Sequence, residues 1–141
     1  MVPDALPKQE EMVVVPIEDA VFVPVSPRLP DGPRIAILWG DPRTGPSAVL
    51  LEMKSGSVPL HVHTADYHLV VIEGLMKHWR EDQSEATAGP LGPGSYWFQP
   101  GGQVHGDACL SEKCVMQIVW SGPRDAHLAS NKLLREMRET N

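Results

Sequence analysis

Three histidines lie close together in the stretch GSVPLHVHTADYHLVVIEG, which spans residues 56–74. Side chains at positions i and i+2 of a strand project from the same face, so His61 and His63 can hold one ion without distorting the backbone. The turn-prone residues 64–66 come next, and His68 can then begin a second strand and face back toward the same point. This spacing predicts a metal site between two neighbouring strands.

A fourth histidine, His105, lies in a second stretch, LGPGSYWFQPGGQVHGDAC, residues 91–109. Here Gly94 opens a strand, and a Pro-Gly-Gly turn at residues 100–102 precedes the histidine. Consecutive glycines permit positive φ, so the turn can aim His105 into the interior of a sheet. A single histidine in a strand is more often a half-buried spacer than a ligand. Four in this arrangement favour a site for one divalent transition metal.

Other polar side chains beside the expected strands are candidates to orient the imidazoles. Asp107 shares strand parity with His105 and is the preferred one. The remaining candidates are Tyr67, Gln99, Gln103 and Gln117. A solvated edge position is the alternative for Asp107 and the three glutamines. Tyr67 precedes His68 and reaches the site only if the strand bulges there; otherwise it points away from the metal. The other two histidines lack this context, so His78 is assigned to packing and His127 to the surface.

The composition is that of an ordinary globular domain. The chain has 141 residues, of which 42% are hydrophobic and 21% charged. Its twelve basic and eighteen acidic residues give a net charge of −6, and no stretch concentrates Lys or Arg, which argues against a nucleic-acid partner. No secretory signal and no apolar run of membrane-spanning length is present, so we expect a cytoplasmic protein with no membrane partner.

Fourteen prolines and twelve glycines are spread along the chain, a pattern that favours short strands separated by turns. Ten short β-rich runs, bounded by Gly, Pro, Asp or Ser, predict an all-β domain over residues 13–123, preceded by a flexible N-terminal arm at residues 1–12. The runs are Val13–Val15, Val21–Val25, Arg34–Trp39, Ser47–Met53, His61–His63, His68–Glu73, Leu75–Arg80, Tyr96–Gln99, Val104–Ala108 and Cys114–Trp120. Several runs, such as residues 69–72, are apolar throughout and need a cover on both faces, which favours a homodimer.

The periodicity changes only at the end of the chain. From Asp125, a residue type that caps helices, apolar residues recur at three- and four-residue steps, which predicts one α-helix within residues 124–141, packed on the outside of the sheets. The apolar residues are Ala126, Ala129, Leu133, Leu134 and Met137.

Cys109 and Cys114 flank a four-residue loop. A hairpin there would place the two sulfurs nearly opposite each other, so a redox-sensitive pair is one interpretation. Two reduced packing cysteines are the favoured one, because two cysteines make no disulfide scaffold and the expected compartment is reducing.

The two histidine stretches together resemble the two sequence motifs of the cupin family. Residues 56–74 contain a Gly, then His-x-His, then a ligand a few residues on, then a closing Gly. Residues 94–105 match the second motif at every fixed position: Gly, five residues, Pro, one residue, Gly, two residues, His. The sequences of the two motifs are most similar to those of small bacterial cupins of uncharacterised function related to the ChrR anti-sigma cupin domain.

This resemblance implies a double-stranded β-helix, a small jelly-roll barrel with the metal near one mouth. It implies His61, His63, His68 and His105 as the ligands. Two positions depart from the family pattern: cupins usually place a glutamate where this chain has His68, and an Asn often follows the last ligand where this chain has Cys109.

Four imidazoles leave the ion more positive than three imidazoles and a carboxylate would, so it attracts oxygenated or anionic small molecules more strongly. Fe²⁺ suits an oxygenase, while Zn²⁺, Mn²⁺ and Ni²⁺ stay open. The resemblance implies a metal-dependent oxygenase, lyase or isomerase, for example a dioxygenase-like enzyme that cleaves a carbon–carbon bond of a small dicarbonyl or hydroxyketone. The alternative is a non-catalytic metal or small-ligand sensor related to anti-sigma cupin domains.

Overall fold

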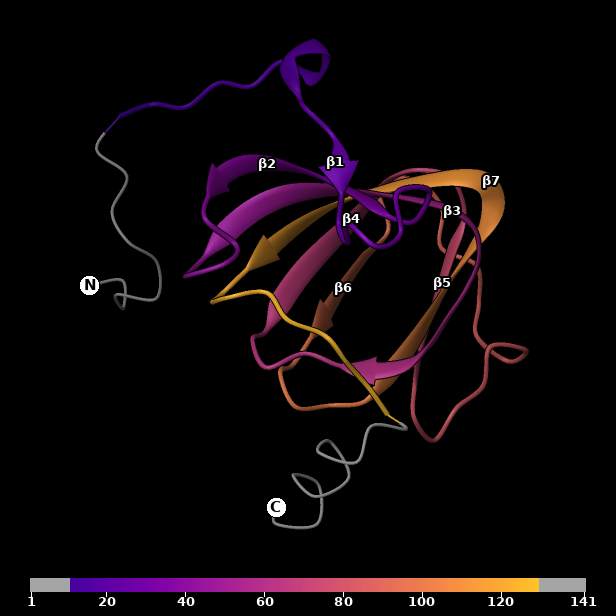
Figure 1. Ribbon diagram of the computed structural model, residues 1–141. Coiled ribbons are helices and arrows are strands. Elements are labelled where there is room, and N and C mark those ends of the chain that lie inside the picture. The colour runs from indigo at the N-terminus through magenta and orange to yellow at the C-terminus, as the bar shows by residue number, and fades with distance from the viewer. Residues whose placement is uncertain (1–10, 130–141) are drawn as a thin grey trace.

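The computed structural model describes residues 11–129, and nearly all of its regular structure is antiparallel β-sheet. Strand pairing is antiparallel throughout these residues, which confirms the all-β prediction. The elements are η1 (Ile17–Asp19), β1 (Val23–Pro24), β2 (Arg34–Gly40), β3 (Ser47–Val62), β4 (Tyr67–Glu73), β5 (Met76–Arg80), β6 (Tyr96–Gln99), β7 (His105–Trp120) and β8 (His127–Leu128). Figure 1 shows the strands curving around a common interior.

Two long strands, β3 and β7, run through both layers of the barrel. They pair along most of their length, with a register shift between the pairs Lys54–Lys113 and Gly56–Cys109. On one side of the shift β2 pairs with β3 and β4 pairs with β7, and β1 and β6 extend this layer at its two edges. On the other side β5 pairs with β7 and β8 with β3. This arrangement is the expected double-stranded β-helix.

The interior between the layers is filled by apolar side chains from both long strands and from β4. One cluster of buried residues includes Val49, Met53, Leu69, Val71, Met76, Met116, Ile118 and Trp120. Burial of each side chain of this size stabilises the fold by roughly 1.5–3 kcal/mol. Six of these side chains also line the cavity described below: Met53, Leu69, Met76, Met116, Ile118 and Trp120.

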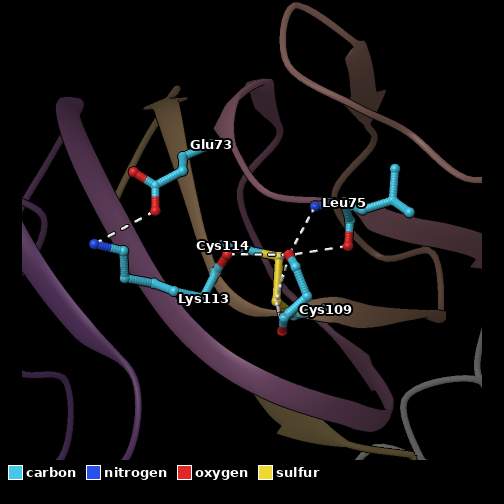
Figure 2. The surroundings of a disulfide bond; sticks show 6 residues. Glu73, Leu75, Cys109, Lys113 and Cys114 are labelled. Atoms are coloured by element: carbon cyan, nitrogen blue, oxygen red, sulfur yellow. Dashed lines mark hydrogen bonds and ion pairs between the residues drawn. A yellow bond between two sulfur atoms is a disulfide. The ribbon is translucent and has the colours of Figure 1, made fainter.

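Cys109 and Cys114 are joined in a disulfide across the register shift of β7, so the preference for two reduced cysteines is wrong here (Figure 2). The shift brings their Cα atoms to 6.0 Å, within the range that a disulfide requires. The hydroxyl of Ser111 accepts a hydrogen bond from the backbone of Leu75 at 2.9 Å and donates one to the carbonyl of Lys113 at 3.1 Å. The cytoplasmic location stays a prediction, and the state of the cysteines does not support it, because they form a disulfide.

The C-terminal segment differs from its prediction at the residues that the structure describes. His127 and Leu128 form β8 and pair with the end of β3, where a helix was expected. Asp125 does not cap a helix, because its carboxylate accepts hydrogen bonds from the backbone and hydroxyl of Thr64 at 2.8 and 2.5 Å. The rest of the predicted helix, residues 130–141, lies outside the described residues, as do residues 1–10 of the predicted arm. Within residues 11–129 no helix is long and apolar enough to cross a membrane.

Candidate metal centre

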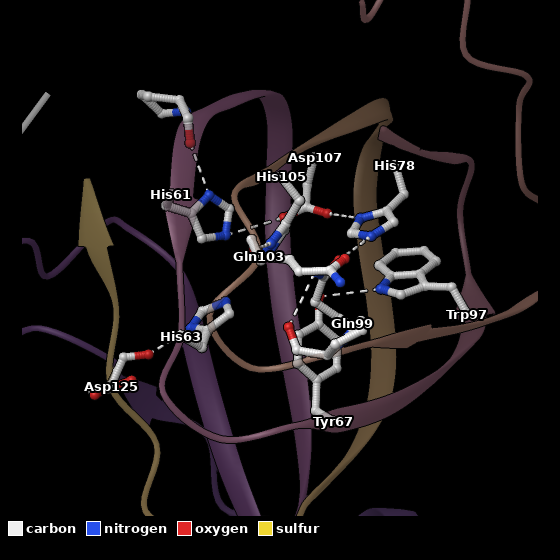
Figure 3. A network of polar contacts seen from close by, with 12 residues as sticks. His61, His63, Tyr67, His78, Trp97, Gln99, Gln103, His105, Asp107 and Asp125 are labelled. Carbon is white, nitrogen blue, oxygen red and sulfur yellow. Dashed lines mark hydrogen bonds and ion pairs between the residues drawn. The ribbon is translucent and has the colours of Figure 1, made fainter. Parts of the chain in front are cut away.

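Three of the predicted ligands converge inside the barrel (Figure 3). His61 lies on β3 and His63 directly follows its last residue, while His105 is the first residue of β7 and the cross-strand partner of His61. The exposed fractions of the three residues are 7%, 7% and 0%. One ring nitrogen from each lies within 4.8 Å of the others. Strand pairing therefore brings together histidines that are more than forty residues apart in the sequence.

Each of these rings is oriented by a hydrogen bond to a backbone carbonyl. The acceptors are Pro59 O for His61 Nδ1 at 2.8 Å, Asp125 O for His63 Nδ1 at 2.5 Å, and Gln103 O for His105 Nδ1 at 3.0 Å. A carbonyl can only accept, so each Nδ1 carries the hydrogen, and in the neutral ring Nε2 keeps its lone pair. Histidine ligands in metal sites are oriented in this way.

Burial keeps two of the rings in the neutral form that a metal requires. It lowers the pKa of His63 and of His105 to about 4, and the hydrogen bonds to the carbonyls of Asp125 and Gln103 raise each pKa by less. The Nε2 atom of His105 is fully buried and has no hydrogen-bond partner among the described residues. An orphaned buried nitrogen facing two further imidazoles fits a bound transition-metal ion.

A carboxylate stands directly beside the cluster. Asp107 is buried on β7, and its Oδ2 lies 3.3 Å from Nε2 of His61. Burial raises the pKa of Asp107, but the hydrogen bond from His78 and the neighbouring histidine charges lower it by more, so the net shift is downward. An ionised oxygen facing the lone pair of His61 requires a proton or a cation between the two atoms.

His78 of β5 anchors this carboxylate and was missed as a site residue. Its Nδ1 hydrogen bonds to Asp107 Oδ1, and its Nε2 lies 2.8 Å from Oε1 of Gln99. The amide nitrogen of Gln99 donates to two backbone carbonyls at 3.3 Å each, which turns its oxygen toward His78. Both ring nitrogens of His78 therefore face hydrogen-bond acceptors, which holds the ring between Asp107 and Gln99. Its ring also stacks on Trp97, with centroids 4.3 Å apart.

The prediction that His68 faces the cluster is wrong. His68 lies on the outer face of β4, where its Nδ1 is 2.6 Å from the hydroxyl of Tyr96 and its ring packs near Phe98. Successive residues of a strand point to opposite faces, and the preceding residue, Tyr67, takes the inward position. The large aromatic ring contributes more to the core than an imidazole would, which decides the parity of β4.

Tyr67 therefore occupies the place expected for the fourth ligand. It is 3% exposed, and its ring centroid lies 5.5 Å from that of His63. Its hydroxyl accepts a hydrogen bond from Nε1 of Trp97 at 3.1 Å and donates none within residues 11–129. Burial, together with the charge of Asp107, raises its pKa well above the ordinary value, so the hydroxyl keeps its hydrogen.

The structure does not bring Gln117 to the site. On β7 the inward positions at this level belong to Met116 and Ile118, and the intervening residue points away from the interior. Gln103 contributes its backbone carbonyl to the site, which accepts hydrogen bonds from His105 and Gln99, while its side chain is exposed. Asp107 and Gln99 are the polar candidates whose side chains the structure places at the cluster.

Two of the three histidines, His61 and His63, line a cavity of about 330 Å³. It is lined by aliphatic and aromatic side chains of both layers, including Leu51, Met53, Val58, Leu69, Trp97, Met116, Ile118 and Trp120. The polar residues on its wall include His61, His63, Tyr67, Asp107 and Arg124. Leu29 and Leu128 also line it and are 60% and 51% exposed, so the cavity reaches the surface beside them. Such a cavity suits a small organic molecule.

A double-stranded β-helix with three inward histidines at one point is the architecture of the cupin class. Within that class the chain belongs to the family described as "Domain of unknown function (DUF4437)", whose model matches residues 17–128. No curated protein matches the sequence.

Solved structures agree with this fold. The polyketide cyclase RemF from Streptomyces resistomycificus is 20% identical with a TM-score of 0.66, over 92% of this chain and 94% of that one. An RmlC-like cupin from Shewanella frigidimarina is 18% identical with a TM-score of 0.59, over 82% and 93% of the two chains. The DMSP lyase DddQ from Ruegeria pomeroyi is 18% identical with a TM-score of 0.59, over 86% and 62%. At these identities the likeness shows the fold.

Proposed function

We propose that this protein is a metal-dependent enzyme acting on a small oxygenated molecule, with one divalent transition metal held by Nε2 of His61, His63 and His105. The observation that carries the proposal is the orphaned, fully buried Nε2 of His105, which faces two further rings whose Nδ1 atoms are tied to carbonyls. A site with three histidine ligands keeps a position open for a substrate, which is typical of catalytic rather than structural metal sites.

Asp107 would supply the carboxylate beside these three ligands. Its Oδ2 is 3.3 Å from Nε2 of His61, so it would add negative charge next to the bound ion. His78 holds the other carboxylate oxygen and would keep Asp107 directed at the cluster.

The bound metal would act as a Lewis acid on a substrate oxygen and, as Fe²⁺, would supply redox chemistry with dioxygen. Tyr67 would donate a hydrogen bond to a substrate oxygen in the cavity, because its hydroxyl keeps its hydrogen and has no other acceptor within residues 11–129. The apolar lining of the cavity would exclude water from the bound molecule.

At a finer level, we propose the oxidative cleavage of a carbon–carbon bond in a small dicarbonyl or hydroxyketone at Fe²⁺. The names of two structural neighbours, a polyketide cyclase and a DMSP lyase, support an enzyme on this fold and leave cyclase or lyase chemistry as the competing outcome. Oxygen uptake by Fe²⁺-loaded protein with acetylacetone as the probe separates the two. Uptake supports the oxidative reaction, and turnover of the probe without uptake overturns it.

The metal site itself is tested by a matched pair of variants, His105→Gln and His68→Gln. Protein purified without chelators is analysed for metal by plasma mass spectrometry, and Fe²⁺-loaded protein is titrated with nitric oxide under anaerobic conditions. We expect His68→Gln to keep one metal per chain and the ferrous-nitrosyl signal, and His105→Gln to lose both. Equal metal content in the two variants would refute the site. Stoichiometric metal that gives no nitrosyl signal in any loaded form would favour a closed structural site.

A further inference from the structure

Arg124 brings a positive charge to the wall of an otherwise mostly apolar cavity. It is half-buried, and its guanidinium carbon lies 5.8 Å from the centre of the Trp120 ring. The same indole packs against His63, with ring centroids 5.0 Å apart. The backbone N–H of Arg124 donates to the carbonyl of Pro42 at 2.7 Å, which fixes the segment against the barrel. Arg124 and His63 therefore both contact the indole of Trp120.

The guanidinium forms no ion pair and no side-chain hydrogen bond within residues 11–129. The adjacent carboxylate, Asp125, is engaged by Thr64 and lies 3.3 Å from Nε2 of His127. The carboxylate on the cavity wall, Asp107, is held by His78 and faces His61. A charge that leaves water without a partner costs free energy. In agreement, burial lowers the pKa of Arg124, although the charge of Asp125 raises it in part.

The side chains of Arg124 and Tyr67 indicate which class of ligand the cavity would bind. A guanidinium binds a carboxylate through two parallel hydrogen bonds, and the hydroxyl of Tyr67 has a hydrogen to donate nearby. One cation and one hydroxyl suit a monoanionic carboxylate better than a phosphate dianion. The volume of about 330 Å³ equals roughly ten water molecules, and its lining is mainly aliphatic and aromatic.

We propose that Arg124 is the anion-binding residue of the cavity and that the substrate is a small carboxylate with a short apolar body, held by Arg124 at one end while another oxygen faces the histidine cluster. This assignment rests on the proposed function, and it names the class of substrate and the residue that selects it. Trp120 packs against both Arg124 and His63, so one short molecule spans the two groups.

The test compares butyrate with its neutral amide, butyramide, in a buffer free of carboxylates and phosphate. Binding is followed by tryptophan fluorescence, because Trp97 and Trp120 line the cavity, and by protein NMR shifts, each with metal-free and with Zn²⁺-loaded protein. We expect butyrate to bind about tenfold or more tightly than butyramide. Arg124→Gln should remove that preference while the metal content stays at one per chain, and Arg124→Lys should restore part of it. Arg43→Gln, which alters an exposed arginine paired with Asp41, is the matched control and should change nothing.

Equal binding of butyrate and butyramide, or an unchanged preference in Arg124→Gln, would overturn the assignment. So would the absence of binding by any straight-chain carboxylate from acetate to hexanoate. The metal-free arm keeps this test separate from the metal site. A preference that depends on Arg124 in a protein that never binds metal would uphold the anion site and refute the proposed function, and metal binding without the preference would do the reverse.

Discussion

The stability of the metal-free protein should fall steeply between pH 7 and pH 5, because two buried histidines resist protonation in the folded state. The pKa of His63 and of His105 is about 4 in the fold and about 6.5 in the unfolded chain. Between these values the unfolded chain binds more protons, so folding free energy is present above pH 6.5 and is lost as the pH falls toward 4. Each histidine accounts for up to about 2 kcal/mol between pH 7 and pH 5 at 1.36 kcal/mol per pKa unit.

The loss is measured by guanidinium chloride unfolding of chelator-treated protein at several values across this range, followed by tryptophan fluorescence. The variants His63→Gln and His105→Gln should each remove about half of the pH dependence, whatever their effect on stability at pH 7. His68→Gln, on the outer face of the barrel, should leave the slope as it is in the wild type. Carboxylate titration adds its own losses at lower pH, because the Asp107 and Asp125 pKa values lie below their ordinary values.

A free energy of unfolding that stays constant or rises as the pH falls from 7 to 5 would refute this reasoning. So would a pH dependence that survives intact when both His63 and His105 are replaced. In the first case the two imidazoles would have to be solvated or already paired with anions in the fold, and a buried cluster of neutral Nε2 ligands would not exist.

Three further outcomes are expected. Tyr67→Phe should cost about 1–3 kcal/mol of stability, because the buried Nε1–H of Trp97 loses its acceptor. Thermal or denaturant unfolding measures this loss directly. An unchanged stability would show that Trp97 finds another partner. Denatured, unreduced protein should show no free thiol at Cys109 or Cys114. Replacing both cysteines by serine should lower the stability by about 2 kcal/mol, because the disulfide closes only a short loop. Two titratable thiols would contradict the disulfide. The homodimer stays a prediction, and light scattering should give twice the chain mass for the wild type. Phe98 is 45% exposed on the outer face, so Phe98→Lys should give a monomer. A monomeric wild type would contradict the prediction.

Much of the site could be predicted from local sequence patterns. The i, i+2 spacing of His61 and His63 placed both on one face, because side-chain alternation in a strand depends only on the backbone. The Pro-Gly-Gly turn before His105 predicted the return of a strand, and Gly102 indeed has a φ of 81°, which favours glycine. The inward direction of Asp107 could be predicted from that of His105, because the two residues are two positions apart in one strand. These inferences need no knowledge of any other strand.

The fourth position could not be predicted, because it depends on the exact length of a turn. One residue more or less between His63 and β4 exchanges the faces of Tyr67 and His68, and the sequence allows either. The burial of the tyrosine ring in the core decided between them. His78 was missed for a related reason. It contacts Asp107 only because of the register in which β5 pairs with β7, and that register cannot be predicted from the periodicity of either strand.

By itself the sequence determined the all-β class, the two histidine motifs and the inward direction of His61 and His63, since these follow from turn-forming residues and from a period of two. The tertiary structure alone decided that Tyr67, and not His68, faces the three imidazoles, and that His78 holds Asp107 beside them. It also decided that Cys109 meets Cys114 and that Arg124 reaches the cavity. The physical reason is that strand register and the burial of large side chains are settled by contacts between distant segments, and those contacts exist only after the barrel closes.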